Sequence, residues 1–438
     1  MAQFRKADDP NQGFLLPPSL KDWLPEGHLA WFIIETVAQL DIDALIDKYR
    51  IAGKGELPYP PRVMLGLLIY SYCTGTFASR KIAAQIDDSI AFRVIAAGLQ
   101  PSFRTICRFR EENLDEFQGL FVQVVRLAKE AGLVKMGTIA IDGSKVKANA
   151  SKHKAMSYDR MLMEENRLRE EIAKLTRAAK RQDEIDDDSF GPDFRGDELP
   201  QELSNRKTRL ATIQAAKKRL EERKAAEGEA KRAAEQKEGD KPAAQENERV
   251  LPQPRDQENF TDPDSRIMPT GGNSFEQCYN AQVAVDGKER IIVANMVSQS
   301  PNDMGQLIPV TNAAFENTEQ VPARVLADTG YKNERDLELL CDMQIDAFVS
   351  VGREGKAART PSSALPCTAA MQRKLATKRG RARYRQRKGI VEPVFGWVKR
   401  VLGFRAFSLR GLRKVAGEWN LVCLAVNLRR IAVMEAAR

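Results

Sequence analysis

Histidine is nearly absent from this chain of 438 residues, which contains only His28 and His153. Enzymes with a paired-histidine metal site need two imidazoles at close spacing, and the sequence has no HxH pair. The six cysteines are scattered and form no CxxC pair, which disfavours a cysteine zinc site and a disulfide framework. A metal site in this chain must therefore be built from carboxylates.

Long apolar runs and leader-like segments are missing as well. The most apolar run, residues 63–70, is far shorter than the roughly 20 residues that span a bilayer. The N-terminal segment contains no secretory apolar stretch, so we expect a cytoplasmic protein without a membrane partner. The segment VGREGKAA lacks the spacing of a Walker A loop, so the sequence shows no nucleotide-hydrolysing motor. A tyrosine recombinase is disfavoured as well, because it needs a nucleophilic tyrosine near its end and the last tyrosine here is Tyr384.

Acidic residues are scarce in one basic segment, residues 373–414. This segment contains fifteen Lys or Arg side chains and a single acid, Glu392, so it carries about +14 in a chain of net charge +9. Such a density of positive charge favours a polyanionic partner such as nucleic acid. A carboxylate among so many cations favours a divalent ion at the same place, although a solvated Glu on a basic helix fits the pattern too.

The first 132 residues are expected to form a helical unit. Short apolar-periodic runs follow one another, each with a Pro or Ser near its start. Ser102 or Thr105 is placed to cap a helix that presents three arginines: Arg104, Arg108 and Arg110. A helix-turn-helix-like DNA reader has this pattern, and a helical bundle with incidental surface arginines fits it equally well.

Two amphipathic stretches with apolar residues at a spacing close to 3.5 follow, at about 158–180 and 203–220. An acidic, turn-rich connector separates them, so we expect an antiparallel coiled-coil hairpin. Residues 225–260 are charged and of low complexity, which predicts a mobile linker.

Strand-like runs lie on both sides of this hairpin. One run, residues 138–142, precedes it, and the later runs alternate with two expected helices near 304–316 and 333–342. The later strands are expected at 277–286, 290–299, 323–328 and 346–351. This order is that of a ribonuclease-H-like α/β domain that the hairpin interrupts after the first strand, which costs little closure entropy.

We therefore divide the chain into an all-α N-terminal domain, an interrupted α/β domain and a coiled-coil insertion. The expected bounds are 1–132 for the N-terminal domain, 133–157 and 263–438 for the two parts of the α/β domain, and 158–262 for the hairpin and linker.

Three acids stand at the ends of expected elements. Asp142 ends the first strand, Asp328 ends the fourth, and Glu392 opens a basic helix with Pro393 in its first turn. Strand ends gather at one edge of an α/β sheet, so these acids are expected to converge. Clustered carboxylates repel one another without a cation, and two divalent ions suit phosphoryl transfer on nucleic acid. Asp142 and Asp328, each taken alone, also fit turn residues.

Several motifs resemble those of the DDE transposases of bacterial insertion sequences, over nearly the whole chain. They are PYPPRVMLGLLIYSYCTGTFASRKIA, PSFRTICRFRE, IAIDGSKVKANAS, YNAQVAVD, VLADTGY and KGIVEPVFGWVKR. The resemblance implies that the catalytic acids are Asp142, Asp328 and Glu392. The related signature of Tyr, two residues, Arg, three residues, Glu, six residues, Lys is kept at Glu392 and Lys399. Lys388 stands where the signature has Arg, and Tyr384 lies one residue further away than it asks.

The resemblance also implies an activity. Such an enzyme binds the terminal inverted repeats of its element, cuts the DNA with metal-bound water and joins the freed 3′-hydroxyl to target DNA. It implies two Mg²⁺ ions, for which Mn²⁺ substitutes, and double-stranded DNA as partner. We expect a homodimer or higher oligomer on DNA, associated with the bacterial nucleoid.

The basic residues expected to contact DNA are Arg104, Arg108, Lys145, Lys147, Arg387, Lys388, Lys399 and Arg400. Four further residues have two interpretations each or an unassigned role. Tyr384 has no settled role; Asn280 lies near the site or pins a strand end; Trp397 stacks on a base or packs as core. Asp303 is expected to cap a helix rather than bind metal.

Two other functions remain open. A ribonuclease-H-like nuclease would use the same three acids without strand transfer, but it would need neither the helical N-terminal domain nor the long insertion. A catalytically silent DNA-binding derivative of a transposase would retain sequence-specific binding alone, and such decay would usually remove one of the acids.

Overall fold

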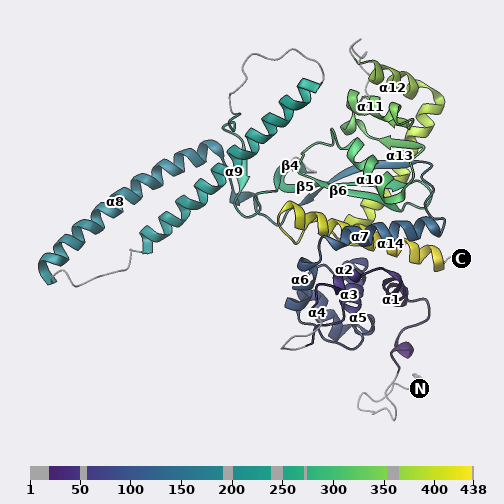
Figure 1. The fold of residues 1–438 in the computed structure, drawn as a ribbon, viewed down its shortest axis with the longest axis horizontal. Helices are drawn as coiled ribbons and strands as arrows, with labels where there is room; N and C mark the ends of the chain where they lie inside the picture. Colours follow the sequence, from purple (N-terminus) through teal and green to yellow (C-terminus); the bar gives the residue numbers. More distant parts are fainter. Residues whose placement is uncertain are drawn as a thin grey trace, which may run out of the picture.

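The computed structural model describes residues 19–49, 57–190, 201–237, 250–270, 274–352 and 365–436. It has a mixed α/β architecture, with a twisted sheet, helices against it and a helical N-terminal region (Figure 1). Two long helices project away from the sheet (Figure 1). None of the helices in the described ranges combines the length and apolarity that crossing a membrane requires.

The sheet is built around strand β1. Its strands are β1 (Ile139–Lys147), β4 (Arg266–Thr270), β5 (Ser274–Asp286), β6 (Ile292–Ser298), β7 (Arg324–Ala327) and β8 (Asp346–Val349). Strand β1 pairs antiparallel with β5 on one side and parallel with β7 on the other, and β8 continues parallel to β7. Strands β4 and β6 pair with β5. The four strands predicted after the hairpin are thus confirmed as β5, β6, β7 and β8, with ends that agree to within three residues.

Strand β1 differs from its prediction because it continues past Asp142 to Lys147, so Asp142 lies inside the strand. Within β1, only Ile139 and Ala140 pair with β7. Beyond Ala140, β1 keeps β5 as partner on one side while its other edge is released from β7. Asp142 therefore lies where two parallel strands diverge, a place at which α/β sheets commonly bind ligands.

The N-terminal helices share one hydrophobic core with the sheet. They are η1 (Leu20–Trp23), α1 (Leu29–Gln39), α2 (Asp43–Ile46), α3 (Pro61–Cys73), α4 (Ser79–Asp88), α5 (Ile90–Ile95), α6 (Phe103–Glu112) and α7 (Glu116–Glu130). Helix α14 (Leu412–Ala436) packs against α3, α7 and β6, and α7 lies beside it under the sheet (Figure 1). Trp419 on α14 is fully buried, and its indole N–H donates to the carbonyl of Gln282 at 3.2 Å.

Helix α14 also carries a buried carboxylate that ties the two regions together. Glu418 accepts hydrogen bonds from the amides of Ser408 and Leu409 and from the hydroxyl of Tyr72 on α3. The guanidinium of Arg110 donates to the same Tyr72 hydroxyl at 3.2 Å. Arg110 is therefore buried, and the expectation that α6 presents it to solvent is wrong. Ser102 caps α6, as predicted.

The helices that follow β6 are α10 (Leu307–Thr318), α11 (Glu334–Asp342), α12 (Pro366–Ala376) and α13 (Lys378–Gly396), with a π-helical turn η4 (Trp397–Val401) after α13. The helices predicted near 304–316 and 333–342 are confirmed. Glu392 does not open a helix: it lies in the last turns of α13, and Pro393 is inside that helix. Proline at this position leaves the carbonyl four residues earlier without its amide donor. The Arg290 side chain donates to that carbonyl, Gly389 O, at 2.9 Å instead.

The projecting helices are α8 (Tyr158–Phe190) and α9 (Gln201–Lys237), and they pack along each other (Figure 1). Their shared core contains Met161, Leu168, Ile213 and Leu220. The buried carboxylate of Glu165 accepts from Lys217 of the other helix at 2.6 Å.

Strands β2 (Ala155–Ser157) and β3 (Gln257–Asn259) pair at the base of the two helices, next to the short helix η2 (Lys152–Lys154). The prediction of a mobile linker over 225–260 is thus wrong at both ends, because α9 continues into this range and β3 lies within it. Residues 238–249 of that range lie outside the described residues, as does the connector from 191 to 200.

Candidate active site

Asp142 is a largely buried carboxylate on the released edge of β1. Its side chain is 19% exposed, and it accepts from Arg387 Nη1 at 3.1 Å and from the amide of Gly143 at 3.0 Å. The pKa of Asp142 is raised to about 6, chiefly by burial and also by the nearby Asp328 and Asp303, while Arg387 opposes the shift. A pKa of this kind is typical of a carboxylate in a functional site.

Arg387 lies between two of the predicted catalytic acids. One of its terminal nitrogens contacts Asp142, and the other is 4.0 Å from Glu392 Oε1. Burial disfavours the charged guanidinium, but Asp142, Tyr384 and Asp328 together outweigh it, and the pKa of Arg387 is raised. Glu392 itself is exposed, with 54% of its side chain accessible. Arg387 is therefore the internal counter-ion of this acidic centre rather than a surface residue.

Asp328 follows β7 and faces the same centre. Its Oδ1 accepts from the amide of Gly330 at 2.7 Å, so it caps the short helix η3 (Thr329–Tyr331). A Cβ atom on Gly330 would lie 3.0 Å from Asp328 Oδ1 and 3.2 Å from Asp303 Oδ2. Asp303, in the loop between β6 and α10, thus places a fourth carboxylate beside Asp328. The structure brings the three predicted acids to one region, together with an acid that was expected elsewhere.

Asp303 does not cap α10, so that prediction is wrong. The N-cap position of α10 is Gln306, which makes no side-chain capping bond. The Oδ1 atom of Asp303 instead accepts from Asn280 Nδ2 and Gln282 Nε2, both at 2.7 Å, and Lys145 Nζ lies at 3.5 Å. Both amides are on β5 and are fully buried.

The network behind Asp303 extends to Tyr331, whose hydroxyl donates to Gln282 Oε1. This bond fixes the orientation of the Gln282 amide, so its NH₂ group must point to Asp303. Asn280 Oδ1 has no hydrogen-bond partner, although it is buried. An unpartnered buried acceptor is costly, so its presence at the acidic centre marks a place for a donor or a cation.

A basic cavity of about 490 Å³ opens next to the acids, along the outer half of β1. Its lining includes Ser144, Lys145, Lys147, Lys399, Arg400 and Arg405. Lys399 Nζ donates to Ser144 Oγ and, at 3.3 Å, to the carbonyl of Lys145. Burial lowers the pKa of Lys399. Four residues predicted to contact DNA thus converge on one surface: Lys145, Lys147, Lys399 and Arg400.

The other predicted residues lie elsewhere. Arg104 and Arg108 are exposed on α6 in the N-terminal helices and do not line this cavity. Lys388 is exposed on α13, one residue after the buried Arg387. Tyr384 lies one turn before Arg387 and hydrogen-bonds to it.

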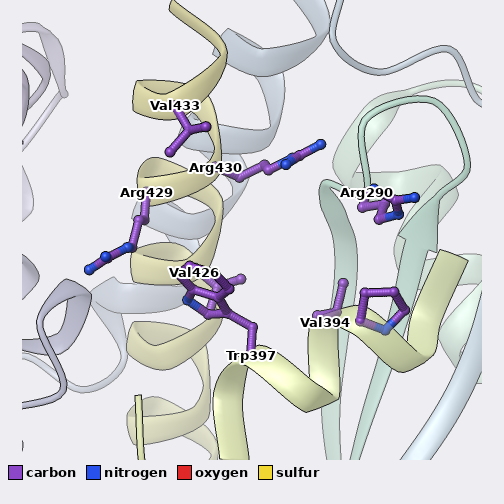
Figure 2. Close-up of a pocket in the computed structure, with 8 residues that line it drawn as sticks. Arg290, Val394, Trp397, Val426, Arg429, Arg430 and Val433 are labelled. Atoms are coloured by element: carbon purple, nitrogen blue, oxygen red, sulfur yellow. The ribbon is translucent and has the colours of Figure 1, made fainter. Parts of the chain in front are cut away.

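Trp397 faces a separate cavity of about 170 Å³ between α13 and α14, where it lies near Val426 (Figure 2). The guanidinium of Arg429 lies 5.2 Å from the centre of its ring. Trp397 is 36% exposed, so it is neither core nor free of packing.

Comparison with known families agrees with this geometry. Residues 255–428 match a family model described as a transposase DDE domain, and residues 18–112 match one described as a transposase domain. The chain belongs to the DDE transposases. The two matches together span more than half of the chain, and the first contains Asp328 and Glu392. No curated protein and no solved structure matches it significantly.

Three features of the transposase site were missed by sequence reasoning: the role of Arg387, the carboxylate of Asp303 and the Gln282–Tyr331 pair. A signal for Arg387 exists, because Tyr384 and Arg387 keep the family spacing of Tyr, two residues, Arg. Counting backwards from Glu392 gives Lys388 instead, since one extra residue separates the Arg from the Glu. No pattern in the sequence marks Gln282 or Tyr331, because they act through a contact between β5 and the distant short helix η3.

The donor set of the transposase suits a hard divalent cation. The side chains around Asp142 offer carboxylate and amide oxygens, and Asn280 Oδ1 lacks a partner. Among the described residues, no three His, Cys, Asp or Glu side chains are close enough together to hold a metal ion as they stand. The positive charge between Asp142 and Glu392 is instead that of Arg387.

Proposed function

We propose that this transposase binds the terminal inverted repeats of an insertion sequence and catalyses metal-dependent DNA cleavage and strand transfer. Family membership indicates a function in transposition. The observation that carries the finer proposal is the meeting of three acids from distant segments around one buried arginine. Asp142 and Glu392 both approach Arg387, and Asp328 contributes to the raised pKa of Asp142.

We further propose that the sheet is a ribonuclease-H-like catalytic domain. The strand order supports this assignment: β5 pairs antiparallel with one side of β1 and with β6 in turn, and β7 and β8 run parallel to β1 on the other side. The domain division at residues 132, 157 and 262 belongs to the same proposal. So does the interpretation of α8 and α9 as a coiled-coil insertion, for which their shared apolar core is the support.

Asp142, Asp328 and Glu392 are the residues that would hold the cations. When bound, divalent ions activate the attacking water or 3′-hydroxyl and stabilise the charge on the transferring phosphate. The chain's own contribution is to position these carboxylates, to keep Asp142 largely away from solvent and to supply Arg387 as counter-ion. Two-ion chemistry with Mg²⁺ is the form that this donor set favours.

The basic cavity supplies the surface for the DNA backbone. Lys145 and Lys147 follow Asp142 on β1, and Lys399 and Arg400 follow Glu392 along the chain, so cations border two of the three acids. Phosphate oxygens bound there would fix the register of the scissile bond relative to the carboxylates. Arg104 and Arg108 on α6 form a second exposed basic site, which we assign to end recognition.

The test uses three isosteric variants: Asp142→Asn, Asp328→Asn and Glu392→Gln. Each is expected to lower cleavage by roughly a thousandfold or more while end binding persists, because a lost carboxylate ligand costs several kcal/mol of transition-state stabilisation. The matched control is Asp342→Asn at the exposed end of α11.

Activity within about tenfold of wild type removes that residue from the site. Cleavage without strand transfer in the wild-type protein points to a nuclease, and end binding without any cleavage points to a silent DNA-binding derivative. A complex with end DNA that contains only a single chain argues against the expected homodimer or higher oligomer.

A further inference from the structure

Asp303 has one carboxylate oxygen held rigidly by the protein and one that is not. Among the described residues, every hydrogen bond to its side chain goes to Oδ1, from Asn280, Gln282 and Lys145. Its side chain is only 18% exposed. An acid that is merely buried for packing would be expected to have both oxygens satisfied by donors. Here the protein orients the group and leaves Oδ2 to another partner.

The second oxygen lies in the neighbourhood of Asp328, beside Gly330. Oδ2 of Asp303 and Oδ1 of Asp328 both approach the position of a Cβ on Gly330, at 3.2 and 3.0 Å. No lysine or arginine is paired with either of these two oxygens among the described residues. Two carboxylates that approach one point without a positive charge between them repel each other, and a divalent cation removes that repulsion.

Gly143, like Gly330, leaves room for the carboxylate of Asp303 in the acidic centre. A Cβ on Gly143 would lie 2.5 Å from Asp303 Oδ1 and 2.3 Å from Gln282 Nε2, closer than side-chain atoms pack. Glycine at 143 therefore lets Asp303 lie against the backbone that carries Asp142. The same position is 2.9 Å from the unpartnered Asn280 Oδ1, so this buried acceptor belongs to the same acidic centre and points independently to a bound ligand there.

We propose that Asp303 is a fourth carboxylate of the active site and binds a divalent cation together with Asp328. Asn280 and Gln282 act as positioning residues, because their NH₂ groups hold Oδ1 and so aim Oδ2 at Asp328. The inference rests on the proposed metal-dependent function, which assigns only Asp142, Asp328 and Glu392 to the metal. It adds a ligand from the loop that precedes α10.

The test is the affinity of the full-length protein for Mn²⁺, measured by electron paramagnetic resonance without DNA. Asp303→Asn is the most informative variant, since Asn Oδ1 still accepts from both amides while the NH₂ group in place of Oδ2 cannot bind a cation. Its affinity is expected to fall by about tenfold or more, with an unchanged melting temperature in chelator. Asp342→Asn is the control for an exposed carboxylate on the same domain.

Gly330→Ala gives an independent measurement, because it keeps every carboxylate and places a methyl group between the two oxygens. It is expected to weaken Mn²⁺ binding as well. Wild-type affinity in both Asp303→Asn and Gly330→Ala overturns the inference. Asp142→Asn distinguishes the proposed metal-dependent function from the assignment of Asp303 as a ligand. If Asp142→Asn weakens Mn²⁺ binding and Asp303→Asn does not, only the assignment of Asp303 is wrong. If the wild-type protein binds no Mn²⁺, the proposed metal-dependent function fails with it.

Discussion

Substitution of Asp142 by Asn should change how the stability of the protein depends on pH. The pKa of Asp142 is raised from 3.8 to about 6 in the folded protein, chiefly by burial. Folding therefore favours the protonated acid. The stability that this proton contributes is complete below about pH 4 and is lost as the pH rises through about 6.

The shift gives the expected magnitude. A difference of about two pKa units corresponds to about 3 kcal/mol between the two protonation states. In chelator, the free energy of unfolding of Asp142→Asn relative to wild type is expected to rise by about 2–3 kcal/mol between pH 4 and pH 7.5. The Arg387 contact is already included in this change, because it lowers the pKa of Asp142 in the folded protein.

The assay is urea unfolding of both proteins at half-unit steps of pH, followed by circular dichroism. Titration of distant groups cancels in the difference, because the two chains differ only at residue 142. A second series with Mn²⁺ should stabilise the wild type by about 2.7 kcal/mol at a hundred times its dissociation constant, and Asp142→Asn by less. A difference between the proteins that stays within about 0.5 kcal/mol from pH 4 to pH 7.5 refutes the burial argument.

Three further outcomes are expected. The binding constant for end DNA should fall by more than about 2 logarithmic units per tenfold increase in salt, since residues 373–414 neutralise several phosphates; a shallower dependence would exclude this segment as the main contact. Replacing residues 158–255 by a short Gly/Ser link should leave the sheet folded but prevent the paired-end complex, and an identical complex on size-exclusion chromatography would reduce α8 and α9 to a passive insertion. Glu418→Ala should lower the free energy of unfolding by about 3 kcal/mol or more, because Tyr72, Ser408 and Leu409 lose a buried acceptor. A loss below about 1 kcal/mol in urea unfolding would show that other groups replace the carboxylate as acceptor.

Local patterns in the sequence were sufficient for most of the elements. The apolar runs of β5 and β6 and the cap at Ser102 predicted elements that the structure contains. The position of Glu392 was not predicted, because a proline normally marks a helix start. The contact that makes Pro393 tolerable within α13 comes from Arg290, about a hundred residues earlier, and no local pattern reveals it.

The candidate site shows the same division. Asp142 and Asp328 were found because each ends an apolar run or follows one. Asp303 has the local surroundings of a helix cap, and only the pairing of β5 with β1 brings Asn280 and Gln282 to it. Arg387 is one of fifteen cations in its segment, and its distinction lies in burial, which charge counting does not detect.

The place of α14 in the core has a consequence for the order of folding during synthesis. This helix packs against α3 and α7 from the start of the chain and against β6 from the sheet, yet it is translated after all of them. Until it emerges, the apolar surfaces of α3, α7 and β6 that α14 covers are exposed, and exposed surfaces of this kind promote aggregation. The nascent transposase is therefore most vulnerable before α14 has been synthesised, and a chaperone that shields α3 would raise the yield of folded protein.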